Sequence, residues 1–218
     1  MVSEYSKAGF SLLVKVEISS TAKNGTKIVT DPYTGVGYEL PPDLQANIVT
    51  VSHTHFDHNY LDGVQGVEKI ITEIGMREEK EILFEGILSD HDPKNGTLRG
   101  KNTVFKITTD GITVCHLGDL GEPYSPKLIE KIGKIDILLI PVGGNYTIDA
   151  KQALAYIHAI NPAIAIPMHY RPQDGTIDIA EAEEFLKLCD EYITTKEKGV
   201  YVPTDFGTET KIVFMERE

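Results

Sequence analysis

Three histidines and one aspartate lie within six consecutive residues, in the segment His53-Thr54-His55-Phe56-Asp57-His58. Imidazole and carboxylate groups are typical zinc ligands, and they also suit iron and manganese. The chain has 7 histidines in 218 residues, so this density is not that of random scatter. If buried without a metal, such a cluster would leave many polar groups unsatisfied. The segment therefore predicts a metal site able to serve two neighbouring ions, with a histidine-rich surface loop as the alternative.

An apolar run, 46–52, comes directly before this segment and predicts a buried strand because β-branched residues dominate it. If the extended backbone continues, His53 and His55 point the same way, since side chains alternate along a strand. Asp57 and His58 then lie on the loop that leaves the strand.

Three more candidate ligands follow predicted strands. His91 comes after the strand 81–89, Asp119 after 112–117 and His169 after 163–168. Strand ends and the loops after them often carry functional groups. Taken singly, each is also typical of an ordinary turn, where such polar residues are common.

The segment 53–58 resembles the HxHxDH signature of the metallo-β-lactamase superfamily, and the other candidates follow in the family's order. The resemblance implies two divalent metal ions with open positions for water, zinc being favoured over iron or manganese. It implies these ligands: His53, His55 and His91 for the first ion, Asp57, His58 and His169 for the second, and Asp119 bridging both.

Two further residues are implied to support the ligands. Asp31 ends the predicted strand 27–30, where the family often has an aspartate behind the metal-binding loop; a turn-capping role is the alternative. His116 competes with His91 as third ligand of the first ion. The resemblance favours His91, because the family places this ligand before a hairpin that precedes Gly118-Asp119. His158 lies in a predicted helix and is interpreted as a surface or packing residue.

The stretches 141–147, 149–150 and 166–170 are similar to the branch that contains the ascorbate-phosphate lactonases. Expected substrate contacts are Gly143, Gly144, Tyr146 and Tyr170, with a glycine turn and packed tyrosines as the alternative. Arg99 and Arg171 are candidates to bind an anionic substrate, although a solvated surface position is the preferred interpretation of both.

The resemblance implies a metal-dependent hydrolase that activates water to attack an ester, lactone or phosphodiester of a small molecule. Asp57 and His58 would then be catalytic as well as ligating, with Asp57 able to accept a proton from the nucleophile. The alternatives are a metal-dependent nuclease and a non-catalytic metal-binding module. The net charge of −12 argues against a nucleic-acid partner, because phosphate backbones are bound by basic surfaces.

The first half of the chain predicts mostly strands, and the second half alternates strands with helices. Strands are expected at 10–18, 27–30, 46–52, 67–74, 81–89, 102–109, 112–117, 135–142, 163–168, 200–202 and 211–215, and helices at 125–133, 149–160 and 179–192. The charged residues 77–80 are interpreted as a segment that separates the predicted strands 67–74 and 81–89. The resemblance implies an α/β fold, an αββα sandwich of two mixed sheets flanked by helices, as one hydrolase domain over residues 1–218.

Composition is that of a soluble globular protein, with 41% hydrophobic and 25% charged residues. Two cysteines, Cys115 and Cys189, form no CxxC pair, which fits a reducing compartment. The first ten residues lack the apolar core of a signal peptide, and no apolar run approaches the roughly 20 residues that span a bilayer. We therefore expect a cytoplasmic protein with no membrane partner; its oligomeric state is left open.

Overall fold

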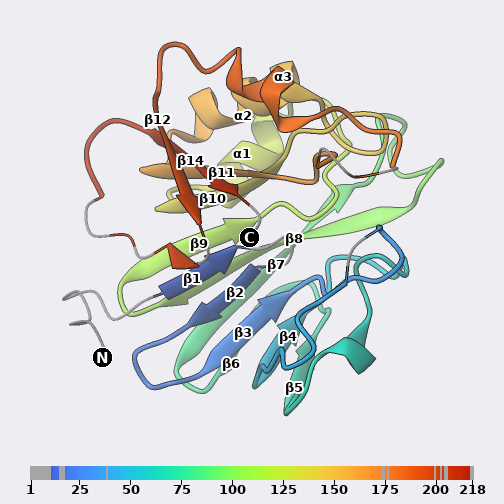
Figure 1. The fold of residues 1–218 in the computed structure, drawn as a ribbon, viewed down its shortest axis with the longest axis vertical. Coiled ribbons are helices and arrows are strands. Elements are labelled where there is room, and N and C mark those ends of the chain that lie inside the picture. The colour runs from blue at the N-terminus through green and yellow to red at the C-terminus, as the bar shows by residue number, and fades with distance from the viewer. Residues whose placement is uncertain are drawn as a thin grey trace.

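The computed structural model describes residues 11–14, 18–37, 39–172, 175, 177–198, 200–201, 203 and 206–216. Predictions for the first ten residues, and for parts of the strands 10–18 and 200–202, lie outside these ranges. The described residues form two β-sheets with helices beside them (Figure 1).

The smaller sheet has six strands in the order β13-β1-β2-β3-β4-β5. Its members are β1 (Ser11–Val14), β2 (Ile18–Thr21), β3 (Lys27–Thr30), β4 (Ile48–Thr50), β5 (Lys69–Ile71) and β13 (Val200–Tyr201). β2 and β3 pair antiparallel across the turn that contains Asn24-Gly25. β4 runs parallel to both β3 and β5. The carboxyl ends of β3 and β4 therefore meet at one edge of the sheet.

The larger sheet has eight strands in the order β12-β14-β11-β10-β9-β8-β7-β6. Its members are β6 (Gly75–Glu79), β7 (Ile82–Asp90), β8 (Lys101–Thr109), β9 (Ile112–His116), β10 (Ile137–Pro141), β11 (Ile164–Met168), β12 (Ile193–Lys198) and β14 (Lys211–Glu216). β9, β10 and β11 are parallel, and β8 is antiparallel to both β7 and β9. β7, β9 and β11 therefore end at the same edge.

Three α-helices lie together on one face of the larger sheet (Figure 1). They are α1 (Pro126–Ile132), α2 (Ala150–Ile160) and α3 (Ala182–Leu186). α1 and α2 confirm the predicted helices, and each begins at a side-chain cap: Ser125 accepts from the Leu128 N–H, and Asp149 forms a capping box with Gln152. None of the described helices is long and apolar enough to cross a membrane.

The two sheets pack face to face. Ile28, Ile48 and Ile71 of the smaller sheet bury against Phe84 and Phe105 of the larger one. This packing confirms the predicted sandwich of two mixed sheets. The outer layers of the two sheets differ, however, because the three described α-helices all lie on the larger sheet. Within the described ranges, loops and the short 3-10 helix η1 (Leu61–Gly63) cover the outer face of the smaller sheet, burying Tyr33, Val36, Leu40, Leu44 and Val64.

The interpretation of residues 77–80 as a separator is wrong. β6 (Gly75–Glu79) is a strand that pairs antiparallel with β7. It forms the edge of its sheet and is mostly exposed, so it tolerates a charged sequence, with Arg77 paired to Glu79 at 3.2 Å.

The predicted helix 179–192 is wrong in extent, because α3 spans only Ala182–Leu186. Tighter i→i+3 hydrogen bonds from the N–H groups of Leu188 and Cys189 end it. The edge strand β12 (Ile193–Lys198) then follows and pairs parallel with β14. Its polar sequence, ITTKEK, carries no apolar alternation by which it could have been predicted.

Candidate metal centre

The candidate ligands meet where strands of both sheets end. Asp31 follows β3 and His53 comes shortly after β4, both in the smaller sheet. His91 follows β7, Asp119 comes shortly after β9 and His169 follows β11, all in the larger sheet. His169 has a φ of 49°, a conformation that is uncommon for non-glycine residues and is found at functional sites.

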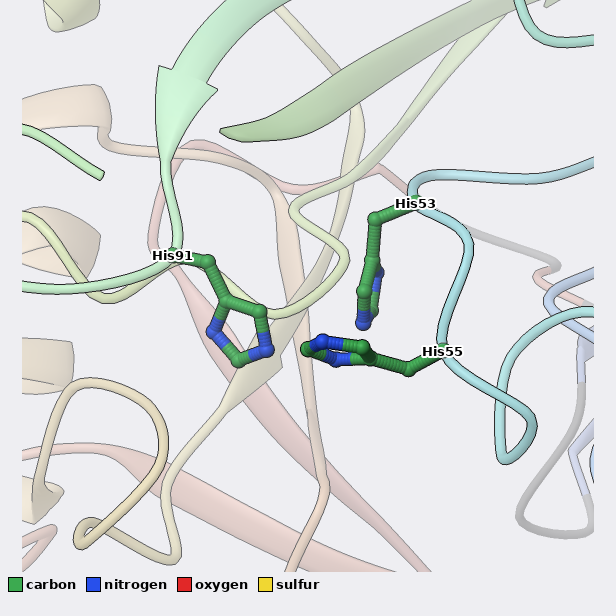
Figure 2. Close-up of side chains that lie close together, drawn as sticks. All are labelled: His53, His55 and His91. Carbon is green, nitrogen blue, oxygen red and sulfur yellow. The ribbon is translucent and has the colours of Figure 1, made fainter. Parts of the chain in front are cut away.

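Six of the seven predicted ligands form two groups of three. The first holds His53, His55 and His91, and the second holds His58, Asp119 and His169; within each, candidate ligand atoms lie within 4.8 Å of one another. A third such group, Asp31, His53 and His58, shares one histidine with each of these two. Figure 2 shows the first group: His53 and His55 come from the loop after β4, and His91 reaches toward them from the end of β7. The ring centroids of His53 and His55 are 4.7 Å apart, and those of His53 and His91 are also 4.7 Å apart.

The Asp119 carboxylate lies between the two groups. Its Oδ2 is 3.3 Å from His91 Nε2 in the first group and 3.5 Å from His169 Nε2 in the second. Its Oδ1 is 3.2 Å from His58 Nε2. The seventh predicted ligand, Asp57, belongs to neither group, but its Oδ2 lies 4.0 Å from His58 Nε2.

The Nε2 of His53 faces this cluster and is buried without a hydrogen-bond partner in the described part of the chain. A buried polar atom with no partner costs roughly 1–3 kcal/mol. Imidazole nitrogens around a shared carboxylate are also the ligand set that zinc, iron and manganese accept. The residues present therefore fit metal ions.

Asp31 sets the proton positions of two of these histidines. The Ser52 hydroxyl and His58 Nδ1, the latter at 3.0 Å, both contact Asp31 Oδ2, and an ionised carboxylate can only accept. His58 Nδ1 therefore carries a proton. Because the Ser52 hydroxyl gives its proton to Asp31, His53 Nδ1, at 2.9 Å, must donate to the Ser52 oxygen. Both rings thus turn Nε2 toward the cluster.

The charges of the centre are strongly coupled. Burial lowers the pKa of His53 to about 3, and the neighbouring His58 adds to this effect. Burial would also lower the pKa of His58, but the carboxylates of Asp119 and Asp31 raise it well above its usual value. Burial would raise the pKa of Asp119, yet His169 and His58 hold it well below its ordinary range. Without a metal, the positive charge of a protonated His58 therefore lies between the two buried carboxylates of Asp31 and Asp119 and offsets part of their negative charge.

His116 and His91 are both buried near the cluster, but they are placed differently. His91 joins His53 and His55, whereas His116 is in neither ligand group of the described residues. The Nδ1 of His116 accepts a hydrogen bond from the Gly118 N–H at 3.3 Å. The geometry thus favours His91 as the third ligand of the first group; the ligand and supporting roles themselves stay predictions.

Asn102 on β8 is a positioning residue that the sequence analysis missed. Its Oδ1 accepts from the Asp119 N–H at 2.9 Å, and its Nδ2 donates to the Leu117 carbonyl at 2.9 Å. A Cβ at Gly118 would lie 2.4 Å from Asn102 Oδ1, so only glycine fits there. The available signal was a lone asparagine at the start of the predicted strand 102–109, whose other residues are mostly apolar or β-branched.

A cavity of about 480 Å³ opens over the cluster, a size that suits a small molecule. The structure brings the predicted substrate contacts Tyr146 and Tyr170 to its wall, but not Gly143 and Gly144. Gly143 instead packs behind His169, where an added Cβ would lie 2.3 Å from the His169 carbonyl oxygen. Gly143 therefore packs against the loop that carries His169, whereas Gly144 lies beside Asp149, where an added Cβ would be 3.4 Å from the Asp149 Cβ.

Comparisons with known proteins agree with the fold and the cluster. The β-lactamase superfamily domain matches residues 19–169, which include every predicted ligand. A UPF0173 protein of Pyrococcus furiosus is 31% identical, with 75% of this chain and 82% of that protein covered. A UPF0173 metal-dependent hydrolase of Carboxydothermus hydrogenoformans is 29% identical, with 68% and 78% covered. The crystal structure of a provisionally assigned Zn-dependent hydrolase of the metallo-β-lactamase superfamily from Thermotoga maritima superposes with a TM-score of 0.77 at 31% identity, covering 96% of this chain and 100% of that one.

The fold, the His/Asp cluster and these matches define a metal-dependent hydrolase of the metallo-β-lactamase fold. The chain belongs to the β-lactamase superfamily, and the relatives named above from Pyrococcus furiosus and Carboxydothermus hydrogenoformans are UPF0173 proteins. The predicted superfamily and the prediction of an enzyme are confirmed.

Proposed function

We propose that the centre holds two divalent metal ions, zinc being favoured, and hydrolyses an ester, lactone or phosphodiester bond of a small molecule. The observation that carries the proposal is the position of Asp119. Its two carboxylate oxygens lie within 3.5 Å of His91 in one ligand group and of His58 and His169 in the other. A shared carboxylate between two histidine groups is what a binuclear site requires.

His53, His55 and His91 would hold one ion, and His58 and His169 would hold the other, with Asp57 completing the second set. When bound, such a pair of ions supplies Lewis acidity and a water activated near neutral pH. Asp57 lines the cavity beside His58, where its carboxylate can take a proton from the attacking water. Asp31 keeps His53 and His58 in the tautomer that ligates through Nε2.

A small-molecule substrate is supported by the cavity and the charge. A volume of about 480 Å³ suits a metabolite-sized ligand. The chain carries 33 acidic and 21 basic residues, an imbalance that disfavours binding along a nucleic-acid backbone.

The test begins with elemental analysis of protein purified without added metal. We expect about two equivalents of metal, as a two-ion hydrolytic site requires, and a sharp fall in a His53→Ala, Asp57→Ala double variant. The control is His158→Ala, which removes an exposed histidine of α2. The loaded protein is then assayed with p-nitrophenyl esters, a lactone and bis-p-nitrophenyl phosphate. A folded protein that neither contains metal nor can be reloaded contradicts the proposal.

A further inference from the structure

Two arginines line the cavity, and their surroundings differ. Arg171 is neutralised: its guanidinium pairs with Glu181 at 2.8 Å, and its Nε donates to the Ile179 carbonyl at 3.2 Å. Arg99 forms no ion pair and no side-chain hydrogen bond with any residue that the structure describes. Its guanidinium instead lies over the ring of Tyr146, with Cζ 5.4 Å from the ring centroid. Of the two arginines that line the cavity, Arg99 is therefore the one without an acidic partner among the described residues.

A buried carboxylate fixes the loop that carries Arg99. Asp92, which directly follows His91, accepts hydrogen bonds from four backbone N–H groups, those of Lys94, Gly96, Leu98 and Arg99. Burial alone would raise the pKa of Asp92, but these donors lower it to about 2. The His91 N–H also donates to the Gly100 carbonyl at 3.1 Å, which closes the loop. The backbone of Arg99 is thereby held in a fixed relation to His91.

The guanidinium of Arg99 is therefore held at one place in the cavity by its loop and by the Tyr146 ring. An arginine in a protein with a net charge of −12 has many carboxylates available as partners. The guanidinium of Arg99 instead lies over an aromatic ring, that of Tyr146, in the same cavity as His91 and His169. A cation–π contact uses none of the N–H donors of a guanidinium, and these donors match the two oxygens of a carboxylate or phosphate.

We propose that Arg99 and Tyr146 form an oxyanion-binding subsite, so that the substrate carries a carboxylate or phosphate group in addition to the bond that is hydrolysed. This inference deepens the proposed function and rests on it. Arg99 is a substrate-binding residue in this account. Arg99 selects substrates that carry a carboxylate or phosphate. With that group bound, the bond to be hydrolysed lies toward the histidine cluster in the same cavity.

The first test compares two esters that differ only in charge, p-nitrophenyl hydrogen glutarate and p-nitrophenyl methyl glutarate. Arg99→Met should lower kcat/KM for the anionic ester by roughly 10- to 100-fold, as expected for a lost charged hydrogen bond. It should lower kcat/KM for the neutral ester much less than for the anionic ester, and Arg99→Lys should recover part of the loss because the charge remains. The matched control is Arg77→Met on β6, an arginine already paired with Glu73 and Glu79.

The second test does not depend on hydrolysis. Phenylglyoxal modifies arginines, and mass spectrometry locates the modified positions. Glutarate or glycerol phosphate should protect Arg99 but not Arg77, and the more effective anion identifies the group preferred. Protection without hydrolysis of any ester supports the anion subsite while the proposed reaction fails. Hydrolysis that is insensitive to Arg99→Met, together with no protection by either anion, overturns the subsite and leaves the proposed reaction standing.

Discussion

At the residue scale, Asp31 serves one histidine in each ligand group. It contacts His58 directly and His53 through Ser52, and its Oδ1 also accepts the Ser52 N–H at 2.7 Å. Burial would raise the pKa of Asp31, but the hydrogen bond from His58 and the nearby histidines lower it. Because the ionised carboxylate of Asp31 can only accept hydrogen bonds, it determines which ring nitrogen of His53 and of His58 carries the proton.

Replacing Asp31 with asparagine should therefore weaken metal binding without touching a ligand. The amide has one acceptor oxygen in place of two, so it cannot hold Ser52 and His58 as the carboxylate does. We expect Asp31→Asn to lower metal affinity by about 10- to 100-fold, the usual effect of losing a hydrogen-bond partner of a ligand histidine. Competition with a chromophoric chelator measures this. Asp62→Asn, at an exposed position of η1, is the control; equal affinities in both variants would contradict the role of Asp31.

Metal binding should also release a proton from His58. Because the pKa of His58 is raised well above its usual value, the metal-free protein carries a proton on Nε2 near neutral pH. A metal must displace this proton, so affinity should increase as the pH rises. Calorimetric titration in two buffers of different ionisation enthalpy counts the protons released. A heat of binding that is the same in both buffers at pH 7 would show that His58 is already neutral.

At the scale of elements, the site depends on close packing between the loops that follow the strands. Gly121 lies against the loop after β7: an added Cβ would be 2.4 Å from the His91 carbonyl oxygen. Gly86 on β7 is similarly crowded, with an added Cβ 2.2 Å from the Glu73 carbonyl oxygen. Only the first of these contacts touches a predicted ligand.

Gly121 and Gly86 can therefore serve as a test position and its control, because both are similarly crowded but only Gly121 lies against His91. Gly121→Ala and Gly86→Ala should each destabilise the fold by about 1–3 kcal/mol, the usual cost of overpacking. Gly121→Ala alone should also reduce metal affinity, because it displaces the backbone of His91. Urea unfolding and chelator competition measure the two effects. If both variants lost metal to the same degree, general destabilisation rather than displacement of His91 would be the cause.

At the scale of the whole molecule, the centre joins the two sheets. Asp31, His53, His55 and His58 follow strands of the smaller sheet, and His91, Asp119 and His169 follow strands of the larger one. Metal bound here would link layers that otherwise pack through apolar residues such as Ile48 and Phe105. Metal binding and global stability are therefore coupled.

Removal of metal should lower the thermal stability of the whole protein. At a free metal concentration about 100 times Kd, binding to the native state contributes about 2.7 kcal/mol. For a chain of this size, that corresponds to a Tm change of about 5–11 °C. Differential scanning calorimetry with and without chelator gives the shift, and re-added metal should reverse it. The His53→Ala, Asp57→Ala double variant should show no chelator effect; an equal shift in that variant would place the stabilising metal elsewhere.

The sequence by itself determined the features that arise locally. The histidine-rich segment 53–58 and the helices predicted at 125–133 and 149–160 each depend on residues that are close together in the chain. Local spacing likewise placed His91, Asp119 and His169 after strands. The family resemblance added the two-sheet sandwich and the pairing of ligands.

Only the tertiary structure decided which strand ends meet. It grouped His91 rather than His116 with His53 and His55, revealed Asn102 behind Asp119, and removed Gly143 and Gly144 from the cavity wall. It also distinguished Arg99 from Arg171, which the sequence had treated alike. The physical reason is that strand order and direction are set by pairing between distant segments. Two residues with the same local pattern can therefore end at a site or in the packing around it.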